Sequence, residues 1–307
     1  MRAAIQRIPV ALAIAALLLL AACARMPEVG RTPLKASSPA ELRGYLLAHP
    51  PDVDQFRLRG PFAVTVKENY EIRLSTTELI ETDLYLSGHK QQVPLVILLH
   101  GHESSKEAHA FQALHLASWG MHCLAVQLPN TGPWIANGKT LAKIVQFIHT
   151  WPEIVDNRID VSHIILAGHS FGGEAAAIAL AEGAPAAGGI LLDPAVDALG
   201  VPGYLQRIAA PVMVIGADED VSAARHREYF YRFIRSGIAE ISIRDAAHED
   251  AQYPAEEGYG TEELQITFAS ALTAAAFSLS ATGNFDYAWA SYGGRQGGVR
   301  FFGARRK

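Results

Sequence analysis

The strongest pattern along the chain is a series of short, nearly continuous apolar runs, separated by stretches with helical potential. Strands buried on both faces have this composition, so the runs predict a mostly parallel sheet with helices on both faces. The five runs are VPLVILLHG (93–101), HCLAVQLP (122–129), HIILAGHS (163–170), GGILLDP (188–194) and PVMVIGADED (211–220). EISIRDAAH (240–248) predicts a last strand that leads into a loop.

Other stretches complete this α/β pattern. Apolar and polar residues alternate in FAVTVKENYEIRL (62–74) and LIETDLYL (79–86), which predicts an antiparallel strand pair. SPAELRGYLLAHPP (38–51) predicts a short helix with Ser38 as N-cap, Pro39 at the first helical position and Glu41 closing a capping box. Residues 261–281 predict a closing helix, amphipathic at first and then apolar. These elements make a doubly wound α/β fold, in which the functional site lies beyond the carboxyl ends of the strands.

The first 22 residues have a different character. Arg2 and Arg7 precede an apolar run from Ile8 to Ala22, which is typical of a secretory signal peptide. The run ends in LAAC (20–23), which resembles the bacterial lipoprotein signal, where the chain is cut before a cysteine that carries lipid. The resemblance implies that acyl chains on Cys23 anchor the mature protein to a membrane of the bacterial cell envelope.

The same patterns divide the chain into four parts. We expect a signal peptide at 1–22, lipidated Cys23 with a tether and short helix at 23–60, an α/β domain at 61–281, and a tail at 282–307. Residues 24–37 contain two prolines and no periodic apolar pattern, which predicts a tether between the membrane and the domain. The final GGRQGGVRFFGARRK (293–307) is glycine-rich and basic, which predicts a flexible tail; the alternative is that it packs or touches an acidic surface.

Composition narrows the class of protein. Half of the residues are hydrophobic and 19% are charged, as in soluble globular proteins. The net charge of −5 becomes more negative once Arg2 and Arg7 are removed, and no basic stripe is present, so nucleic acid is not an expected partner. With Cys23 lipidated, Cys123 has no cysteine to pair with, and we expect it to be buried in a core strand.

The segment IILAGHSFGGEA (164–175) contains the pattern Gly-x-Ser-x-Gly around Ser170. A nucleophile elbow needs small residues at Gly168 and Gly172, because the strained turn lifts the serine hydroxyl above the sheet. A serine hydroxyl also needs a histidine to accept its proton and a carboxylate to orient that histidine. His248, on the loop after the last predicted strand, is the best candidate for the base.

Residues 62–281 resemble the α/β-hydrolase superfamily, on the strength of LLHGHESS, GHSFG and DAAHED in that order. The family order of serine, acid and histidine admits three acids here. The resemblance favours Asp220, since an acid-x-Asp run after this strand is the pattern of lidless polyester and lipid-ester hydrolases. Asp218 in the same run and Asp193 after the preceding strand stay open as alternatives.

An oxyanion hole needs two preorganised backbone donors. The resemblance places one at the N–H of Phe171, directly after the nucleophile, and the other at the N–H of His102 in the loop after His100-Gly101. The polyester hydrolases often carry an aromatic residue where this chain has His102, and they carry a disulfide that this chain cannot form. We expect no metal at His100-x-His102, because the spacing lacks a further ligand, and no other cofactor.

Only about 16 residues separate ILLDP from APVMVIG, which leaves no room for a large cap. The resemblance therefore implies an open site, as in cutinase-like, dienelactone-hydrolase-like and platelet-activating-factor-acetylhydrolase-like enzymes, with Trp134 and Trp151 as candidates for its entrance. The expected activity is hydrolysis of a small or surface-bound carboxylic ester through an acyl-enzyme. A thioesterase, acyltransferase or amidase would use the same residues. A catalytically silent lipoprotein scaffold is a third hypothesis, but it would not need the serine, the acid and the histidine together.

Overall fold

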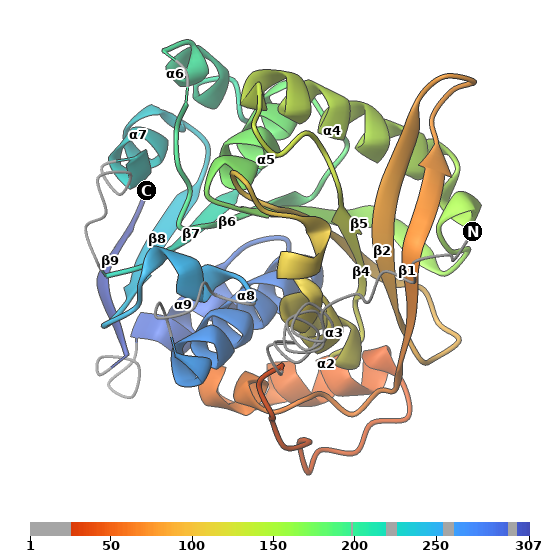
Figure 1. The fold of residues 1–307 in the computed structure, drawn as a ribbon. Coiled ribbons are helices and arrows are strands. Elements are labelled where there is room, and N and C mark those ends of the chain that lie inside the picture. Colours follow the sequence, from red (N-terminus) through yellow and green to blue (C-terminus); the bar gives the residue numbers. More distant parts are fainter. Residues whose placement is uncertain (1–25, 198, 219–225, 254–260, 294–299) are drawn as a thin grey trace, which may run out of the picture.

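The computed structural model describes residues 26–197, 199–218, 226–253, 261–293 and 300–307. Within these ranges nine strands form one sheet in the order β1-β2-β4-β3-β5-β6-β7-β8-β9 (Figure 1). Strands β3 to β8 pair in parallel, while β1, β2 and β9 run antiparallel to their neighbours. The strands are β1 (Val64–Arg73), β2 (Leu79–Ser87), β3 (Val93–Leu99), β4 (His122–Val126), β5 (Ile159–His169), β6 (Gly188–Leu192), β7 (Val212–Gly216), β8 (Ile238–Ile243) and β9 (Phe301–Arg306).

Helices cover both faces of this sheet (Figure 1). Helices α4, α5, α6 and α7 pack on one face of the sheet and form one hydrophobic core with it. Helices α2, α3, α8 and α9 pack on the other face and form a second core. The helices are α2 (Pro39–Ala48), α3 (Ala110–Ser118), α4 (Trp134–Thr150), α5 (Phe171–Ala181), α6 (Val201–Leu205), α7 (His226–Phe233), α8 (Glu262–Thr282) and α9 (Asp286–Gly293). The predicted doubly wound α/β fold is confirmed, and Cys123 is buried in β4 as expected.

The connection between β6 and β7 is short. Its described residues contain one five-residue helix, α6. The prediction that no large cap is inserted at this position is therefore confirmed.

Helix α8 is the one described helix that is long and apolar enough to cross a membrane. Its most apolar stretch is 89% buried inside the protein. Phe268 and Leu272 belong to the core that lies between α8 and the sheet. Burial of this kind identifies α8 as a core helix.

The start of α2 differs in detail from the predicted capping box. Ser38 Oγ accepts the N–H of Glu41 at 3.2 Å, as an N-cap does. The carboxylate of Glu41, however, accepts the N–H of Ser37 at 2.8 Å, one residue before the cap. The helix forms where the sequence predicts it, with the reciprocal hydrogen bond displaced by one residue.

Residues 26–37, the described part of the predicted tether, lie against the domain. The N–H of Thr32 donates to Arg59 O at 2.7 Å, and the N–H of Arg59 donates to Gly30 O at 2.9 Å. Val29 packs against a small apolar cluster at the amino ends of α3 and α8. Pro27 is buried. These backbone pairs and apolar contacts hold the segment against the domain.

The described end of the predicted flexible tail, residues 300–307, packs against the domain, which is the alternative left open above. Helix α9 packs into the core beside α8, and β9 pairs with β8 at the edge of the sheet. An uncovered edge strand leaves unpaired N–H and C=O groups, and β9 satisfies those of β8. The guanidinium of Arg305 lies 2.8 Å from the buried carboxylate of Glu240, which fixes the tail to the edge.

Candidate active site

Ser170 occupies the sharp turn between β5 and α5. Its backbone has φ 53° and ψ −127°, a left-handed conformation that a serine adopts only under constraint. A Cβ at Gly168 would lie 2.3 Å from Gly172 O, and a Cβ at Gly172 would lie 2.3 Å from His100 O. A Cβ at Gly173 would lie 2.8 Å from the Pro194 side chain. The glycines are therefore required by close packing around the turn, as the pattern predicts.

The loop after β3 lies directly against Ser170. A Cβ at Gly101 would lie 2.9 Å from the Cβ of Ser170, so only glycine lets the loop approach this closely. The ring of the next residue, His102, meets the ring of Phe171 edge-on with centroids 6.0 Å apart. The two residues predicted to supply oxyanion donors thus contact each other close to Ser170. The N–H of Phe171 is also in the first turn of α5, where backbone donors have no partner within the helix.

His100 stabilises the base of the same loop. Its Nδ1 lies 2.9 Å from Gly101 O, and its Nε2 lies 3.0 Å from Leu128 O. Burial lowers the pKa of this histidine, so the ring is neutral at pH 7. Both ring nitrogens face backbone groups rather than His102.

His248 lies in the short 3₁₀ helix His248–Ala251 that follows the loop after β8. Its Nδ1 is 2.6 Å from Oδ2 of Asp193, which immediately follows β6. Asp193 is buried, and its Oδ1 accepts the N–H of Ala217 at 2.9 Å. Its φ of 37° is another constrained backbone conformation. The carboxylate is thus held in place from two sides.

Among the described residues, the acid that is hydrogen-bonded to His248 is Asp193. Asp220 itself lies outside the described residues. Asp218 Oδ2 accepts the N–H of Asp245 at 2.9 Å, in the loop that leads to His248. Among the three candidates, the described hydrogen bond to the imidazole comes from Asp193.

Two opposing effects set the pKa of His248. Burial disfavours the imidazolium, but the hydrogen bond and the negative charge of Asp193 outweigh it and raise the pKa. Because Nδ1 donates to the carboxylate, Nε2 of the neutral ring is left as the proton acceptor. This is the tautomer that a general base needs.

Arg227, on α7, is a residue that the sequence reasoning missed. Its Nε lies 3.5 Å from Oδ1 of Asp193, and its charge opposes the rise in the pKa of His248. A Cβ at Gly216 would lie 2.0 Å from Arg227 Nη1, so the guanidinium fills space that only glycine leaves open. A glycine at the end of β7 is the available sequence signal, and it does not point to an arginine eleven residues later.

His169 contacts His248, although it occupies the variable position before the serine in the Gly-x-Ser-x-Gly pattern. Its ring centroid is 4.4 Å from that of His248, and its Nε2 lies 3.0 Å from His248 O. Burial first, and then the positive charge of His248, lower its pKa well below the ordinary value. A neutral ring with the proton on Nε2 donates to that carbonyl and fixes the backbone of His248.

The two tryptophans considered for the entrance lie at opposite ends of α4. Trp134 is buried and stacks on Phe171 with centroids 5.6 Å apart, directly beside Ser170. Trp151 is 52% exposed and follows the last turn of α4. A helix rises 1.5 Å per residue, which separates the two by about 25 Å. Trp134 therefore stabilises the wall of the site, and Trp151 lies far from it.

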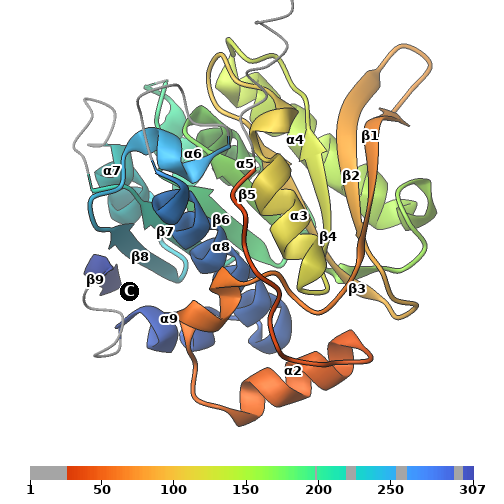
Figure 2. The same ribbon diagram turned by 60° about the horizontal axis from the view of Figure 1, so that its bottom comes forward.

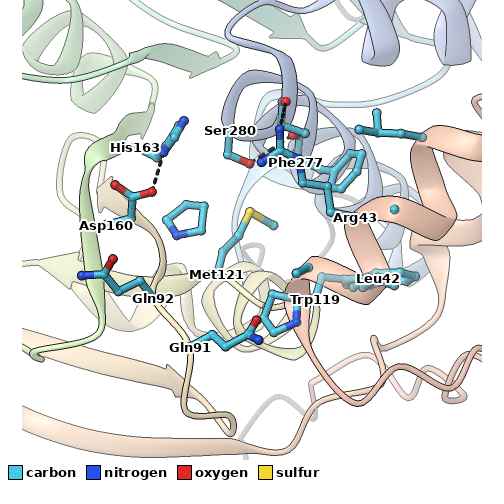
Figure 3. A pocket seen from close by; sticks show the side chains of 17 residues that line it. Leu42, Arg43, Gln91, Gln92, Trp119, Met121, Asp160, His163, Phe277 and Ser280 are labelled. Atoms are coloured by element: carbon cyan, nitrogen blue, oxygen red, sulfur yellow. Dashed lines mark hydrogen bonds and ion pairs between the residues drawn. The ribbon is translucent and has the colours of Figure 1, made fainter.

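A cavity of about 360 Å³ lies at the opposite edge of the sheet (Figure 3). Its walls come from α2, from the amino ends of β3 to β5, and from the end of α8. Trp119, Met121 and Phe277 form its apolar part, and Asp160 and His163 pair at its rim with a distance of 2.7 Å. Because these strands begin here and Ser170 follows the end of β5, the cavity is separate from the candidate site.

Comparison with known proteins agrees with this geometry. The model of the alpha/beta hydrolase family matches residues 96–295, which contain Ser170, Asp193 and His248. A search of curated proteins gave no match. Since the family match covers most of the chain, the protein belongs to the alpha/beta hydrolase family, and a hydrolase activity follows from that membership.

Proposed function

We propose that the protein is a carboxylic-ester hydrolase with Ser170 as nucleophile, His248 as general base and Asp193 as the orienting acid. The observation that carries this proposal is the 2.6 Å hydrogen bond between His248 Nδ1 and Asp193. Ser170, held at φ 53°, donates its N–H to the residue before Asp193, Leu192 O, at 3.1 Å. A buried Asp–His pair next to a strained serine is the arrangement that activates a hydroxyl for acyl transfer.

The reaction proceeds in two halves. Ser170 Oγ attacks the ester carbonyl carbon while His248 Nε2 accepts the hydroxyl proton, and Asp193 stabilises the resulting imidazolium. The tetrahedral oxyanion accepts hydrogen bonds from the N–H groups of Phe171 and His102. Collapse breaks the ester C–O bond, and His248 returns the proton to the leaving alcohol. Water then attacks the acyl-enzyme by the same route and releases the carboxylic acid.

Two features support an ester as the substrate. The connection between β6 and β7 carries no large cap, which suits a small or surface-presented ester better than a long chain that must be enclosed. Phe171 and Trp134 form an apolar wall beside Ser170 that suits an acyl group. We further propose that acyl chains on Cys23 anchor the enzyme in the bacterial cell envelope.

A fluorophosphonate probe tests the nucleophile. We expect covalent labelling of the wild-type protein and no labelling of Ser170→Ala. Absence of labelling in the folded wild type would instead favour a catalytically silent scaffold. A panel of p-nitrophenyl esters of increasing acyl length, with a thioester and a peptide amide beside them, then identifies the bond cleaved. Mass spectrometry of the membrane fraction tests Cys23, since an unmodified cysteine contradicts the anchor.

A further inference from the structure

The packed N-terminal segment shortens the distance between Cys23 and the domain. Met26 and Val29 pack against Phe111 of α3 and Ile266 of α8. The N–H of Glu28 donates to the Glu262 carboxylate at 3.0 Å, at the start of α8. Met26 is only three residues after Cys23, and three residues of fully extended chain span at most about 11 Å. A lipid on Cys23 would therefore hold this part of the domain close to the bilayer.

The described part of this segment begins at the carboxyl edge of the sheet, the edge that carries Ser170. In Figure 2 the segment descends between α3 and α8 from their amino ends towards α2. Its apolar cluster also includes Tyr253, which comes five residues after His248. The N–H of Tyr253 donates to Ala108 O at 2.6 Å, and His109 pairs with Tyr253 in a parallel bridge. The ring of His109 is in turn 6.4 Å from that of His169.

We propose that the carboxyl edge of the sheet faces the membrane, and that Ser170 attacks acyl esters presented at the bilayer surface. This inference rests on the proposed function and its lipid anchor. The polar layer on each side of a bilayer is about 5 to 8 Å thick. A reach of about 11 Å from the acylated residue to Met26 barely exceeds that layer. The opposite edge, with the cavity of Figure 3, then faces away from the lipid.

An exposed apolar side chain on the same edge fits this orientation. Leu199 lies between β6 and α6, in the connection that begins with Asp193, and its side chain is fully exposed (101%). A Cβ at the neighbouring Gly200 would lie 3.9 Å from the side chain of Ile135, which follows Trp134 in α4. Transfer of an exposed leucine side chain from water to lipid is favourable, because it removes apolar surface from water. Leu199 is therefore positioned to contact the bilayer at the edge of the sheet that carries Ser170.

The orientation can be measured without relying on activity. The full lipidated chain is placed in phosphatidylcholine vesicles after labelling Leu199→Cys or, as the matched control, Lys90→Cys with one fluorophore. Lys90 is exposed at the amino end of β3, and Cys123 is buried. We expect a headgroup-linked quencher to quench the label at 199 several-fold more than the label at 90. Equal quenching, or stronger quenching at 90, overturns the proposal. Failure of the chain to associate with vesicles removes the anchor and the proposal with it.

A second measurement tests the substrate. A Gly/Ser insert of 20 residues between Arg25 and Met26 lengthens the reach by about 25 Å, and the same insert after Lys307 is the control. We expect the first insert to lower hydrolysis of a vesicle-embedded acyl ester several-fold while hydrolysis of a soluble p-nitrophenyl ester stays unchanged. Unchanged rates on both substrates contradict membrane presentation. If the wild type does not hydrolyse the soluble p-nitrophenyl ester, the esterase function is contradicted instead. The quenching experiment still decides the orientation in that case.

Discussion

Replacement of Asp193 by asparagine is the sharpest test of the proposed catalytic residues. Asp193 Oδ2 accepts a hydrogen bond from His248 Nδ1 at 2.6 Å, and its Oδ1 accepts the N–H of Ala217. Asparagine has nearly the same volume, so the packing around β6 is preserved. One oxygen can still serve Ala217, which turns the amide NH₂ towards His248. A donor there favours the imidazole tautomer with its proton on Nε2, which cannot accept the proton of Ser170.

The expected loss is large and falls on kcat. An Asp-to-Asn change that leaves the geometry intact but imposes the wrong tautomer costs a serine hydrolase on the order of 10,000-fold in kcat, or about 5.4 kcal/mol. We expect Asp193→Asn to show this loss on p-nitrophenyl acetate, with KM little changed. The pKa of His248, raised mainly by Asp193, should also fall, so the acidic limb of the pH profile moves to lower pH.

Asp220→Asn and Asp218→Asn are the matched comparisons. Asp218 contacts the backbone of Asp245 rather than the imidazole, so its variant should lose much less activity. A large loss in Asp220→Asn with a nearly active Asp193→Asn would refute the assignment of the acid. Thermal unfolding of each variant separates loss of catalysis from loss of fold.

Three further changes test the surroundings of the site. Arg227→Met removes a positive charge 3.5 Å from Asp193, so the pKa of His248 and the acidic limb of the kcat/KM profile should rise, while Arg227→Lys should shift them less. Gly101→Ala places a methyl group 2.9 Å from the Cβ of Ser170; the displaced loop should lower kcat by about 100-fold, and a fully active variant would contradict the packing argument. Glu174 is buried and its pKa is raised from 4.5 to about 7, so the folded state binds an extra proton between these values and stability should fall by about 3 kcal/mol as pH rises across them. Glu174→Gln should flatten this dependence in urea titrations.

The fold was predictable because buried parallel strands have an unmistakable composition. Runs such as LVILL (95–99) and IILAG (164–168) contain no polar side chain, and each lies in a strand of the sheet. The elbow was also predictable, since a Cβ at Gly168 or at Gly172 would lie 2.3 Å from a backbone carbonyl oxygen, so neither position tolerates a side chain. The contact between Gly168 and Gly172 acts within a few residues, and its pattern of glycines around Ser170 is visible in the sequence.

The contacts at the two ends of the chain cannot be predicted from local sequence, because the partners are distant in sequence. Gly30 and Thr32 exchange hydrogen bonds with Arg59, and Arg305 pairs with Glu240. Neither segment has the apolar periodicity of an independent element, and both are ordered by contacts with a strand or helix formed elsewhere. Tertiary context overrides local composition in such segments.

The choice of acid depended on the same kind of distant geometry. Ser170 follows β5, Asp193 follows β6, the run 218–220 follows β7, and the loop that leads to His248 follows β8. Neighbouring strands are about 4.8 Å apart, so His248 must return across two strands to approach Ser170. Asp218 fixes that return, because its Oδ2 accepts the N–H of Asp245 and its own N–H donates to Ala246 O. An acid on β6, one strand from the nucleophile, then meets the returning imidazole. Asp218, in the acidic run after β7, therefore contributes to placing the histidine, and in the proposed triad Asp193 orients its ring.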